Sequence, residues 1–334
     1  MATPSLDVRV LSPSEIDLAA TVEVLNAAFR TYDFLGADRT SLEEIGHELA
    51  PESKVMQVFD NGRLIATATL TPAEIAQPER EKFPGIDYAR SAYFAMAGVL
   101  PERMGEGLGR RLVAEAERLA RVAGFERMIL STIEEMGNVA YYGKLGYESV
   151  SVRELPPGYW GLTITAHEHG MARALTPVCI RLAGPDDATT IADLVNLAYR
   201  VEDFFKVGDR TDAAEIAEII DRGRFFVAEQ EGRAVGCVYV TVAGNRGHFG
   251  MLSVHPETQG QGLARSLLET VERYCLEQGC EYLDMEYVNL REELPAFYGR
   301  FGFEETGTQP WPEDQLHRIS RPAHFVTMTR RIAP

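Results

Sequence analysis

The feature that most constrains the fold is an internal repeat, because a chain that restates itself builds one structural unit twice. The stretch Val99–Gly109 lines up with Val254–Ala264, 155 residues further along this 334-residue chain. Downstream, Tyr141–Glu148 lines up with Phe297–Glu304, 156 residues apart. Matches in the same order at nearly the same spacing indicate a tandem duplication.

A third match, near the start of each copy, reveals an insertion. Asn26–Arg30 corresponds to Asn196–Arg200 with an offset of 170 residues, so the first copy carries 15 extra residues (170 minus 155). They fall within 72–90, a stretch rich in Pro, Glu and Lys that predicts a solvated loop. We therefore expect two domains of ordinary size, 1–175 and 176–334.

A glycine-rich turn lies at the centre of each copy. In the second copy an apolar run ends at Val254 and an amphipathic pattern begins at Leu263, which predicts a strand, a turn and a helix. The first amides of a helix have no partner within it and lie at the positive end of its dipole. Gly260 and Gly262 lack the Cβ atoms that would keep a phosphate away from this backbone. The turn therefore predicts an anion cradle that suits a pyrophosphate.

Two familiar phosphate-binding motifs do not fit this turn. A P-loop requires a Gly-Lys-Ser/Thr run, and a dinucleotide fingerprint requires a third glycine on the first strand of its unit. Gln259–Ala264 instead resembles the Gln/Arg-x-x-Gly-x-Gly/Ala signature of the GCN5-related N-acetyltransferase (GNAT) superfamily. The pattern Tyr-x-x-x-Gly-Phe/Tyr, which starts at Tyr298 and again at Tyr142, is similar to a second motif of that family.

The predicted elements of both copies follow the order of the GNAT fold, an α/β fold with a mixed central sheet. Each copy is predicted to run strand, two helices, three strands, helix, strand, helix and two strands. In the first copy, Thr40-x-x-Glu43 predicts a capping box for a helix over 42–49, and Asn61-Gly62 predicts a hairpin turn. We expect two tandem GNAT domains.

The resemblance implies that acetyl-CoA is the acyl donor. In the family, backbone groups of the strand before the glycine turn bind the pantetheine and support the oxyanion, and the turn binds the pyrophosphate. The residues assigned to the donor in this way are Leu252, Ser253, Val254, Gln259, Gly260, Gln261, Gly262, Leu263 and Ala264 in the second copy, and Val99, Gly105, Gly107, Leu108 and Gly109 in the first.

Catalytic roles carry over in the same way. Tyr298, and Tyr142 in the first copy, match the tyrosine that often protonates the departing thiolate in the family. Relatives often place a basic Glu on the strand before the turn, but neither copy has a carboxylate there. Glu286, on the next strand, is our candidate base, and Asp203, Glu202 or a chain of waters are alternatives. Direct attack by the amine requires no Ser or Cys nucleophile.

The two copies differ within the signature itself. Gln259 keeps the family pattern and can reach a phosphate oxygen, whereas Met104 stands at the matching position of the first copy and cannot. The glycines of the first turn and Tyr142 are nevertheless retained. We therefore expect the second copy to hold the active site and the first to be weakened or structural.

Composition limits partners and compartment. A net charge of −17 argues against nucleic-acid binding and suits an amine acceptor. Residues 1–5 lack signal-peptide features, and no apolar run reaches the length of a membrane span. The four cysteines show no Cys-x-x-Cys spacing, which predicts reduced, packed residues in a cytoplasmic protein. His167-x-His169 has no third ligand, so we expect no metal site.

Together these observations predict an N-acetyltransferase that acts on a primary amine of a small molecule or peptide. The resemblance also implies that the two domains pack as an internal pseudo-dimer. One alternative is an acyl-CoA-binding protein without turnover, since both central strands lack carboxylates. Another is a different donor, either a longer acyl-CoA or an aminoacyl-tRNA, and the acidic balance counts against tRNA.

Overall fold

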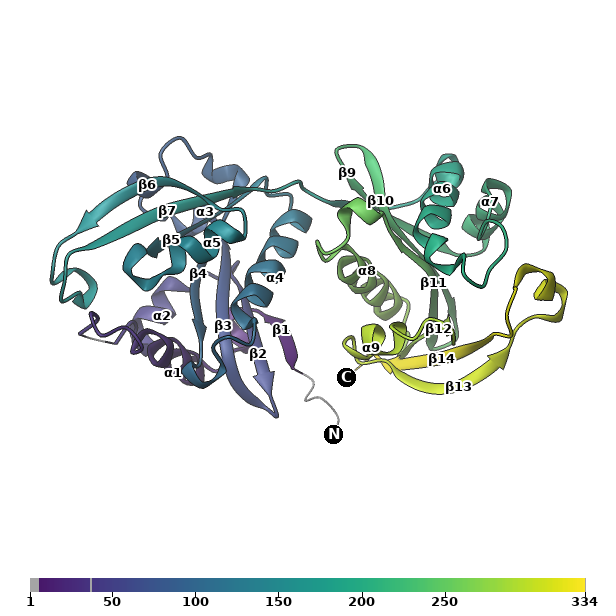
Figure 1. Ribbon diagram of the computed structural model, residues 1–334, viewed down its shortest axis with the longest axis horizontal. Coiled ribbons are helices and arrows are strands. Elements are labelled where there is room, and N and C mark those ends of the chain that lie inside the picture. The colour runs from purple at the N-terminus through teal and green to yellow at the C-terminus, as the bar shows by residue number, and fades with distance from the viewer. Residues whose placement is uncertain (1–5, 37, 334) are drawn as a thin grey trace. The chain divides into compact units, whose positions relative to one another are not determined.

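The computed structural model describes residues 6–36 and 38–333. The stretch 1–5, on which the signal-peptide expectation depends, lies outside the described residues. The chain divides between Pro177 and Val178 into two compact units (Figure 1). We call them the first and second domain and describe each by itself.

The first domain contains a seven-stranded sheet with strand order β1-β2-β3-β4-β5-β7-β6. Its strands are β1 (Asp7–Leu11), β2 (Lys54–Asp60), β3 (Arg63–Pro72), β4 (Ser91–Val99), β5 (Arg127–Ile133), β6 (Glu148–Leu155) and β7 (Ala166–Ala174). Its helices are α1 (Leu18–Phe29), α2 (Leu42–Glu48), α3 (Ala73–Ala76), α4 (Leu108–Val122) and α5 (Asn138–Lys144). All neighbouring strands are antiparallel except β4 and β5, which are parallel.

The second domain repeats this plan, with strand order β13-β14-β12-β11-β10-β9-β8. Its strands are β8 (Cys179–Leu182), β9 (Arg224–Gln230), β10 (Arg233–Ala243), β11 (Arg246–Val254), β12 (Tyr282–Val288), β13 (Glu304–Pro310) and β14 (His324–Arg331). Its helices are α6 (Ala188–Tyr199), α7 (Ala213–Arg222), α8 (Leu263–Glu277) and α9 (Leu294–Gly299). The one parallel pair is β11 and β12. The predicted order of elements is confirmed in both domains.

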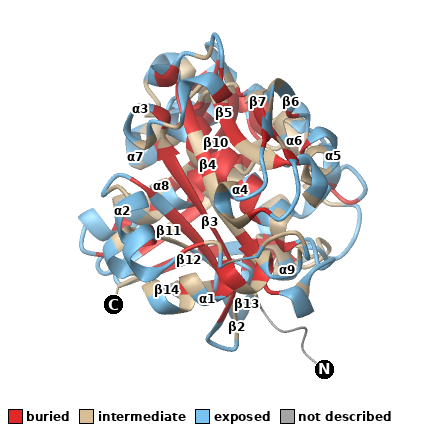
Figure 2. Cartoon of the chain, turned by 90° about the vertical axis from the view of Figure 1, so that its left-hand side faces the viewer, coloured by how far each residue is buried: buried red, intermediate tan, exposed pale blue. Residues whose placement is uncertain are grey.

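Successive side chains of a strand point to opposite faces of the sheet, so each sheet has an apolar layer on both faces. In the second domain, Val238 and Val240 of β10 pack toward α8, while the alternate residues Cys237 and Tyr239 pack toward α6 and α7. The helices α8 and α9 thus cover one face, and α6 and α7 cover part of the other (Figure 1). Figure 2 shows the buried central strands of the sheet and the exposed outer surfaces of the helices.

Local signals were mostly located correctly, with one helix cap displaced. Asn61 and Gly62 take φ values of 49° and 81° between β2 and β3, as the hairpin turn requires. The predicted capping box at Thr40 and Glu43 is wrong by one residue. Ser41 Oγ accepts a hydrogen bond from the Glu44 amide, and the Glu44 carboxylate accepts one from the Ser41 amide. Thr40 is buried instead, because its backbone pairs with the Asn26 side chain.

The prediction of a solvated loop over 72–90 is wrong. The segment forms α3 and two turns of 3-10 helix, and it buries Phe83 and Tyr88 against the sheet. These rings pack on Ile129 of β5 and Ala172 of β7. We call residues 73–90 the insertion. Although the insertion is rich in charged residues, it also contains Phe83 and Tyr88. Burial of these two rings favours packing of the insertion on the sheet over exposure to solvent.

Three further expectations concern chemistry outside the fold. All four cysteines are free thiols; Cys237, Cys275 and Cys280 are buried as predicted, but Cys179 is exposed. Among the described residues no cluster of His, Cys, Asp or Glu could hold a metal ion. None of the helices within the described ranges combines the length and apolar character needed to cross a membrane.

Candidate active site

Each sheet opens at its parallel pair of strands. The ladder between β11 and β12 ends at Phe249 and Met285, although β11 continues to Val254. We call the space beyond this last pair the wedge of the second domain. On the wedge side, residues 250–254 have no neighbouring strand, and backbone polar groups require partners. An extended ligand can therefore pair with β11 as a strand would.

A backbone irregularity marks the edge of the wedge. Met251 has a φ of 50°, and the register of β11 on β10 shifts there, so that two residues oppose one. Such a bulge bends the strand and turns its amides out of the ladder. The first domain repeats this detail: β4 and β5 part after Tyr93 and Ile129, and Met96 has a φ of 48°. An unusual φ at matching positions, 155 residues apart, is a built feature of the fold.

The glycine turn follows β11 directly and ends at helix α8. Gly262 caps the helix with a φ of 81° and no side-chain cap, and the first backbone bond of the helix runs from the Ser266 amide to the Gly262 carbonyl. The first amides of the helix, at Leu263 and Ala264, therefore have no partner within it. A Cβ added to Gly260, which has a φ of 79°, would meet no atom within 4 Å. The turn is thus an open cradle of amides that fits a pyrophosphate.

The first domain keeps the cradle but changes its charge. Gly107 caps α4 with a φ of 77°, and the space beside Gly105 and Gly107 is open. Glu106 stands between these glycines, and its carboxylate accepts hydrogen bonds from Arg103 at 2.7 and 2.8 Å. Met104 is 47% exposed, whereas Gln259 donates a hydrogen bond to the Val254 carbonyl at 3.4 Å. The first cradle therefore carries an acid and lacks the glutamine.

The two candidate tyrosines are buried on the helix that follows the wedge. Tyr298 on α9 packs on Phe249, with ring centroids 6.0 Å apart, and Tyr142 on α5 packs on Tyr147 at 5.8 Å. Burial raises the pKa of both phenols above their usual range, with a smaller contribution from a neighbouring tyrosine in each case. For Tyr298 that neighbour is Tyr199, at the end of α6. Both phenols therefore keep their protons at neutral pH.

Glu286 lies at the mouth of the second wedge. It follows Met285, the last residue of β12 that pairs with β11, and its side chain is exposed. It borders a hollow of about 270 Å³ on the sheet face opposite α8. The hollow is lined by Arg246, His248, Asp284, Met285, Glu286, Thr306, Gln309, Thr327, Met328 and Thr329. Tyr298 packs on the α8 side, so the wedge separates the candidate acid from the candidate base.

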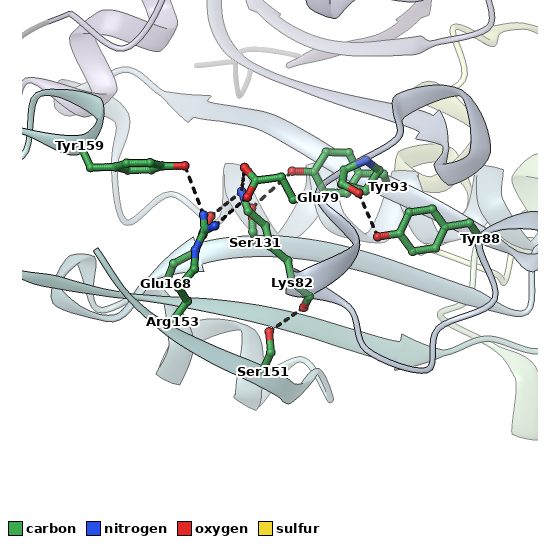
Figure 3. Close-up of polar contacts among 10 residues, drawn as sticks. Glu79, Lys82, Tyr88, Tyr93, Ser131, Ser151, Arg153, Tyr159 and Glu168 are labelled. Carbon is green, nitrogen blue, oxygen red and sulfur yellow. Dashed lines mark hydrogen bonds and ion pairs between the residues drawn. The ribbon is translucent and has the colours of Figure 1, made fainter. Parts of the chain in front are cut away.

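The same sheet positions in the first domain are covered by the insertion. Ser131, which corresponds to Glu286, pairs with Gly170 of β7, and a Cβ built on Gly170 would overlap the Lys82 carbonyl. The Lys82 ammonium lies 2.9 Å from Glu168, and Arg153 lies 2.7 Å from the other oxygen of that carboxylate (Figure 3). Because Glu168 is only 1% exposed, these contacts fix the insertion on the sheet.

The alternative bases occupy different environments. Glu202 is 5% exposed and accepts a hydrogen bond from Arg291 at 3.0 Å. Burial raises its pKa, and Arg210, Arg291 and Lys206 oppose that rise. Asp203 is exposed and lines a cavity beside Tyr199. The structure thus brings Tyr298, Tyr199 and the Arg291–Glu202 pair into one neighbourhood, since Arg291 and Tyr199 both affect the pKa of Tyr298.

Two parts of the site were missed from the sequence. The bulge could have been found, because Phe94 and Met96 match Phe249 and Met251 at the repeat spacing of 155 residues. The role of Tyr199 could not, because no motif links the end of α6 to α9. Only the packing of the two helices on opposite faces of one sheet brings them together.

Comparison with known proteins agrees with the resemblance. An acetyltransferase (GNAT) family model matches residues 19–147, and an acetyltransferase (GNAT) domain model matches residues 221–305. Solved structures with similar folds include the ribosomal-protein-S18-alanine N-acetyltransferase of Escherichia coli, at 18% identity over 47% of this chain and 95% of that one, with a TM-score of 0.39. An N-acetyltransferase of Staphylococcus aureus Mu50 is 15% identical over 47% of this chain and 100% of that one, with a TM-score of 0.40.

A third structure, that of Salmonella typhimurium yncA with its cofactor acetyl-CoA, is 19% identical over 47% of this chain and 94% of that one, with a TM-score of 0.39. The two family models, one in each domain, carry the assignment. They also indicate N-acetyltransferase activity, and the family uses acetyl-CoA as its donor. The chain belongs to the GNAT family and is an acetyltransferase with two GNAT domains in tandem.

Proposed function

We propose that this protein transfers an acetyl group from acetyl-CoA to a primary amine of a small molecule or peptide, mainly in its second domain. One observation carries the choice of domain. In the second domain a hollow bordered by Glu286 lies on the sheet face next to the start of the wedge, whereas the insertion covers the matching positions of the first domain. An acceptor must reach the thioester from that side, because the glycine turn holds the donor at the other end of β11.

In the second domain, backbone groups of the protein would bind most of the donor. The unpaired edge of Leu252, Ser253 and Val254 would hold the pantetheine, and the open turn at 259–264 would hold the pyrophosphate. Acetyl-CoA supplies an activated thioester. Gln259 is exposed and lies next to the cradle, where its amide can donate to a phosphate oxygen.

The transfer proceeds by direct attack. The neutral amine nitrogen forms a bond to the thioester carbon, the carbon–sulfur bond breaks, and the amine proton leaves to a base. Glu286 is the proposed base because it is exposed at the mouth. Glu202 is the alternative, because a pKa raised by burial makes its carboxylate a better proton acceptor near neutral pH. The β11 amides at the bulge would stabilise the negative charge on the carbonyl oxygen.

Tyr298 is the proposed acid that protonates the departing thiolate. The burial that raises its pKa keeps the phenol protonated, but it also makes proton loss harder. Transfer to sulfur is therefore effective only where the thiolate charge develops beside the hydroxyl. Tyr142 has the same pKa shift in a covered domain and would be a packing residue.

The experiment measures thiol release from acetyl-CoA by the full chain against a panel of primary amines. We expect turnover with some amines, a large loss in Glu286→Gln and a smaller loss in Glu202→Gln. The reverse order would make Glu202 the base. Tight binding of acetyl-CoA without thiol release on any amine would instead favour the acyl-CoA-binding alternative. Propionyl-CoA and octanoyl-CoA in the same assay decide the acyl length.

We also propose that the protein is cytoplasmic and that it binds neither nucleic acid nor membrane. The cytoplasmic location rests on the sequence, whose four cysteines show no disulfide or Cys-x-x-Cys spacing. The acidic composition supports an amine acceptor rather than a nucleic acid or membrane. The packing of the two domains as an internal pseudo-dimer stays a prediction.

A further inference from the structure

A second cavity of the second domain lies beside α6 and has a volume of about 440 Å³. Its lining consists of Asn196, Tyr199, Arg200, Asp203, Lys206, Val207, Gly208, Asp209 and Arg210. Three of these side chains are cationic and two are acidic, so the lining is net positive in a chain whose net charge is −17. A positive cavity in such an acidic protein needs a specific explanation.

Lys206 is the unusual member of the lining. It is 7% exposed, and its ammonium nitrogen is buried without a hydrogen-bond partner among the described residues. A buried, unpaired ammonium is costly, and native proteins seldom keep one without a use. Burial, followed by the charges of Arg210 and Arg318, lowers the pKa of Lys206 to about 7, against the opposing effect of Glu202 and Glu215.

Arg210, a second cation of the cavity, also has an N–H donor without a hydrogen-bond partner among the described residues. Arg210 lies with its guanidinium carbon 5.3 Å from the ring centre of Tyr199, and its Nε is buried without a partner. Arg200 is exposed. The lining thus has a buried cation, Lys206, and an exposed one, Arg200. A lysine and an arginine that line one cavity, each with an N–H donor that has no partner among the described residues, are suited to a carboxylate.

The cavity adjoins the proposed acetyl-transfer site. Tyr199 lines the cavity and also affects the pKa of Tyr298. The segment that carries Lys206 is fixed to the sheet, because the buried Phe205 packs with Val288, two residues beyond Glu286 on β12. A ligand in the cavity therefore lies on the same side of the fold as the mouth of the wedge.

The first domain has a similar backbone bridge at the corresponding place. Leu35 forms an isolated bridge with Leu162, and Lys206 forms the matching bridge with Ile319. Leu35 packs in an apolar cluster with Ile133 and Leu155. The bridge therefore forms in the first domain without a lysine, so this backbone arrangement does not require Lys206.

We propose that the cavity binds a carboxylate carried by the amine acceptor, with Lys206 and Arg210 as its partners. The inference rests on the proposed function and names its substrate class: amino acids, or other amines that bear an acidic group. A monoanion matches the single net charge of the lining better than a phosphate dianion. The two exposed acids, Asp203 and Asp209, would oppose the second charge.

The test compares matched acceptors on the full chain. Glycine, 4-aminobutyrate and 6-aminohexanoate are each measured against their own carboxamides. For at least one chain length, the carboxylate should have a kcat/KM about tenfold or more above its carboxamide, as expected for a charge-assisted contact. Lys206→Leu, which introduces the residue of the first domain, should reduce that ratio to about one. Arg222→Gln, which changes an exposed cation on α7, should leave the ratio as it is.

A pH series adds a readout that a merely structural lysine would not produce. Above pH 7 the Lys206 ammonium loses its proton, so the advantage of the carboxylate over its carboxamide should shrink. The pH series uses 4-aminobutyrate and 6-aminohexanoate, in which the amine is remote from the carboxyl group and titrates similarly in the acid and its carboxamide, so that comparison within each pair largely removes the titration of the acceptor amine. A ratio that stays constant with pH, or equal rates for carboxylate and carboxamide in the wild type, would overturn the inference while leaving acetyl transfer intact.

Calorimetry separates this inference from the proposed function. If no amine is acetylated, binding of 4-aminobutyrate and 6-aminohexanoate to the wild type, lost in Lys206→Leu, would still support the carboxylate site. Absence of binding by both would overturn it. Phosphoethanolamine supplies the remaining arm, because preference for it over the amino acids would assign the cavity to phosphate instead.

Discussion

Each domain has its own sheet of the same topology, but the corresponding faces of the two sheets differ: one is covered and the other is open. In the first domain that face is apolar and small, with Ile129, Gly170 and Ala172, and the insertion lies on it. In the second domain the matching strands carry Asp284, Glu286, Thr327 and Thr329, and a hollow remains. At the register of Gly170 the second domain has Thr327, whose side chain would occupy the place of the insertion backbone.

This difference shows how a duplicated fold can divide its tasks. The wedge, the bulge and the glycine cradle persist in both domains, because they depend on backbone geometry that the fold itself maintains. Access to the wedge depends on side chains of one sheet face, which a few substitutions can convert from a polar surface to a docking surface. Retained machinery is therefore weaker evidence for activity than an open approach to it.

The largest expected effect tests the two tyrosines against each other. Tyr298→Phe should lower kcat by about 10²- to 10⁴-fold, the usual contribution of an acid–base group. Tyr142→Phe should change kcat by less than about twofold, because the proposed function assigns turnover mainly to the second domain. Steady-state thiol release with a common amine measures both. Equal losses in the two variants would mean that both domains are active, and retention of full rate by Tyr298→Phe would remove its acid role.

Each domain also contains one buried lysine. Substitution of the first should lower the free energy of unfolding of its domain, and substitution of the second should raise it. Lys82→Met should destabilise the first domain by about 3 kcal/mol, because it removes the partner of the buried Glu168 carboxylate. Lys206→Leu should stabilise the second domain by roughly 1–3 kcal/mol, because it removes an unpaired buried ammonium. Urea denaturation measures both changes. Trp160 reports on the first domain and Trp311 on the second.

The pH dependence of these changes fixes their cause. The pKa of Lys206 is lowered to about 7 from 10.5, so the folded state loses stability as pH falls from about 10.5 to 7. The gain from Lys206→Leu should therefore be largest near pH 7 and vanish above pH 10.5. The pKa of Lys82 is raised, since contacts with Glu168 outweigh burial, so its contribution is fully present below pH 10.5 wherever the Glu168 carboxylate is ionised, and it is lost only as pH rises above that value. Pure packing effects would show no such dependence.

A third comparison concerns the glycine cradles. Gly260→Ala should raise the KM for acetyl-CoA about tenfold, because a Cβ enters the space that the pyrophosphate needs. Gly105→Ala makes the same change in the first domain and should leave that KM within about twofold. Both glycines have positive φ values, 79° and 87°, so each variant should lose about 1 kcal/mol of stability. Two equivalent sites in an acetyl-CoA titration would contradict the asymmetry.

Much of this architecture could be predicted from the sequence, because the main motifs occur in both domains and support each other. The order of elements, the hairpin at Asn61-Gly62 and the two glycine turns were located from residue patterns alone. The insertion was not, since its charges suggested solvent and its anchors, Phe83 and Tyr88, acquire meaning only against the sheet. The cavity around Lys206 was equally hidden, because a lysine in a loop is ordinarily exposed.

The smallest effect concerns a contact between Gly109 at the start of α4 and Tyr141 on α5, where the domains differ by a hydroxyl and a methyl group. In the first domain, the Tyr141 hydroxyl is buried without a partner among the described residues, and a Cβ on Gly109 would approach it to 3.1 Å. The second domain has Phe297 and Ala264 at these positions. The glycine thus accommodates the tyrosine, and the alanine accompanies the phenylalanine.

A double-mutant cycle tests this compensation. Tyr141→Phe should stabilise the first domain by up to about 1 kcal/mol, because the unpaired hydroxyl is removed. Gly109→Ala alone should gain little, because the relief of helix entropy is offset by the close approach to the hydroxyl. Combined with Tyr141→Phe, it should gain roughly 0.5–1 kcal/mol, the usual advantage of alanine over glycine in a helix. Strictly additive changes would mean that the two positions vary independently, and that the difference between the cradles does not extend into the helices behind them.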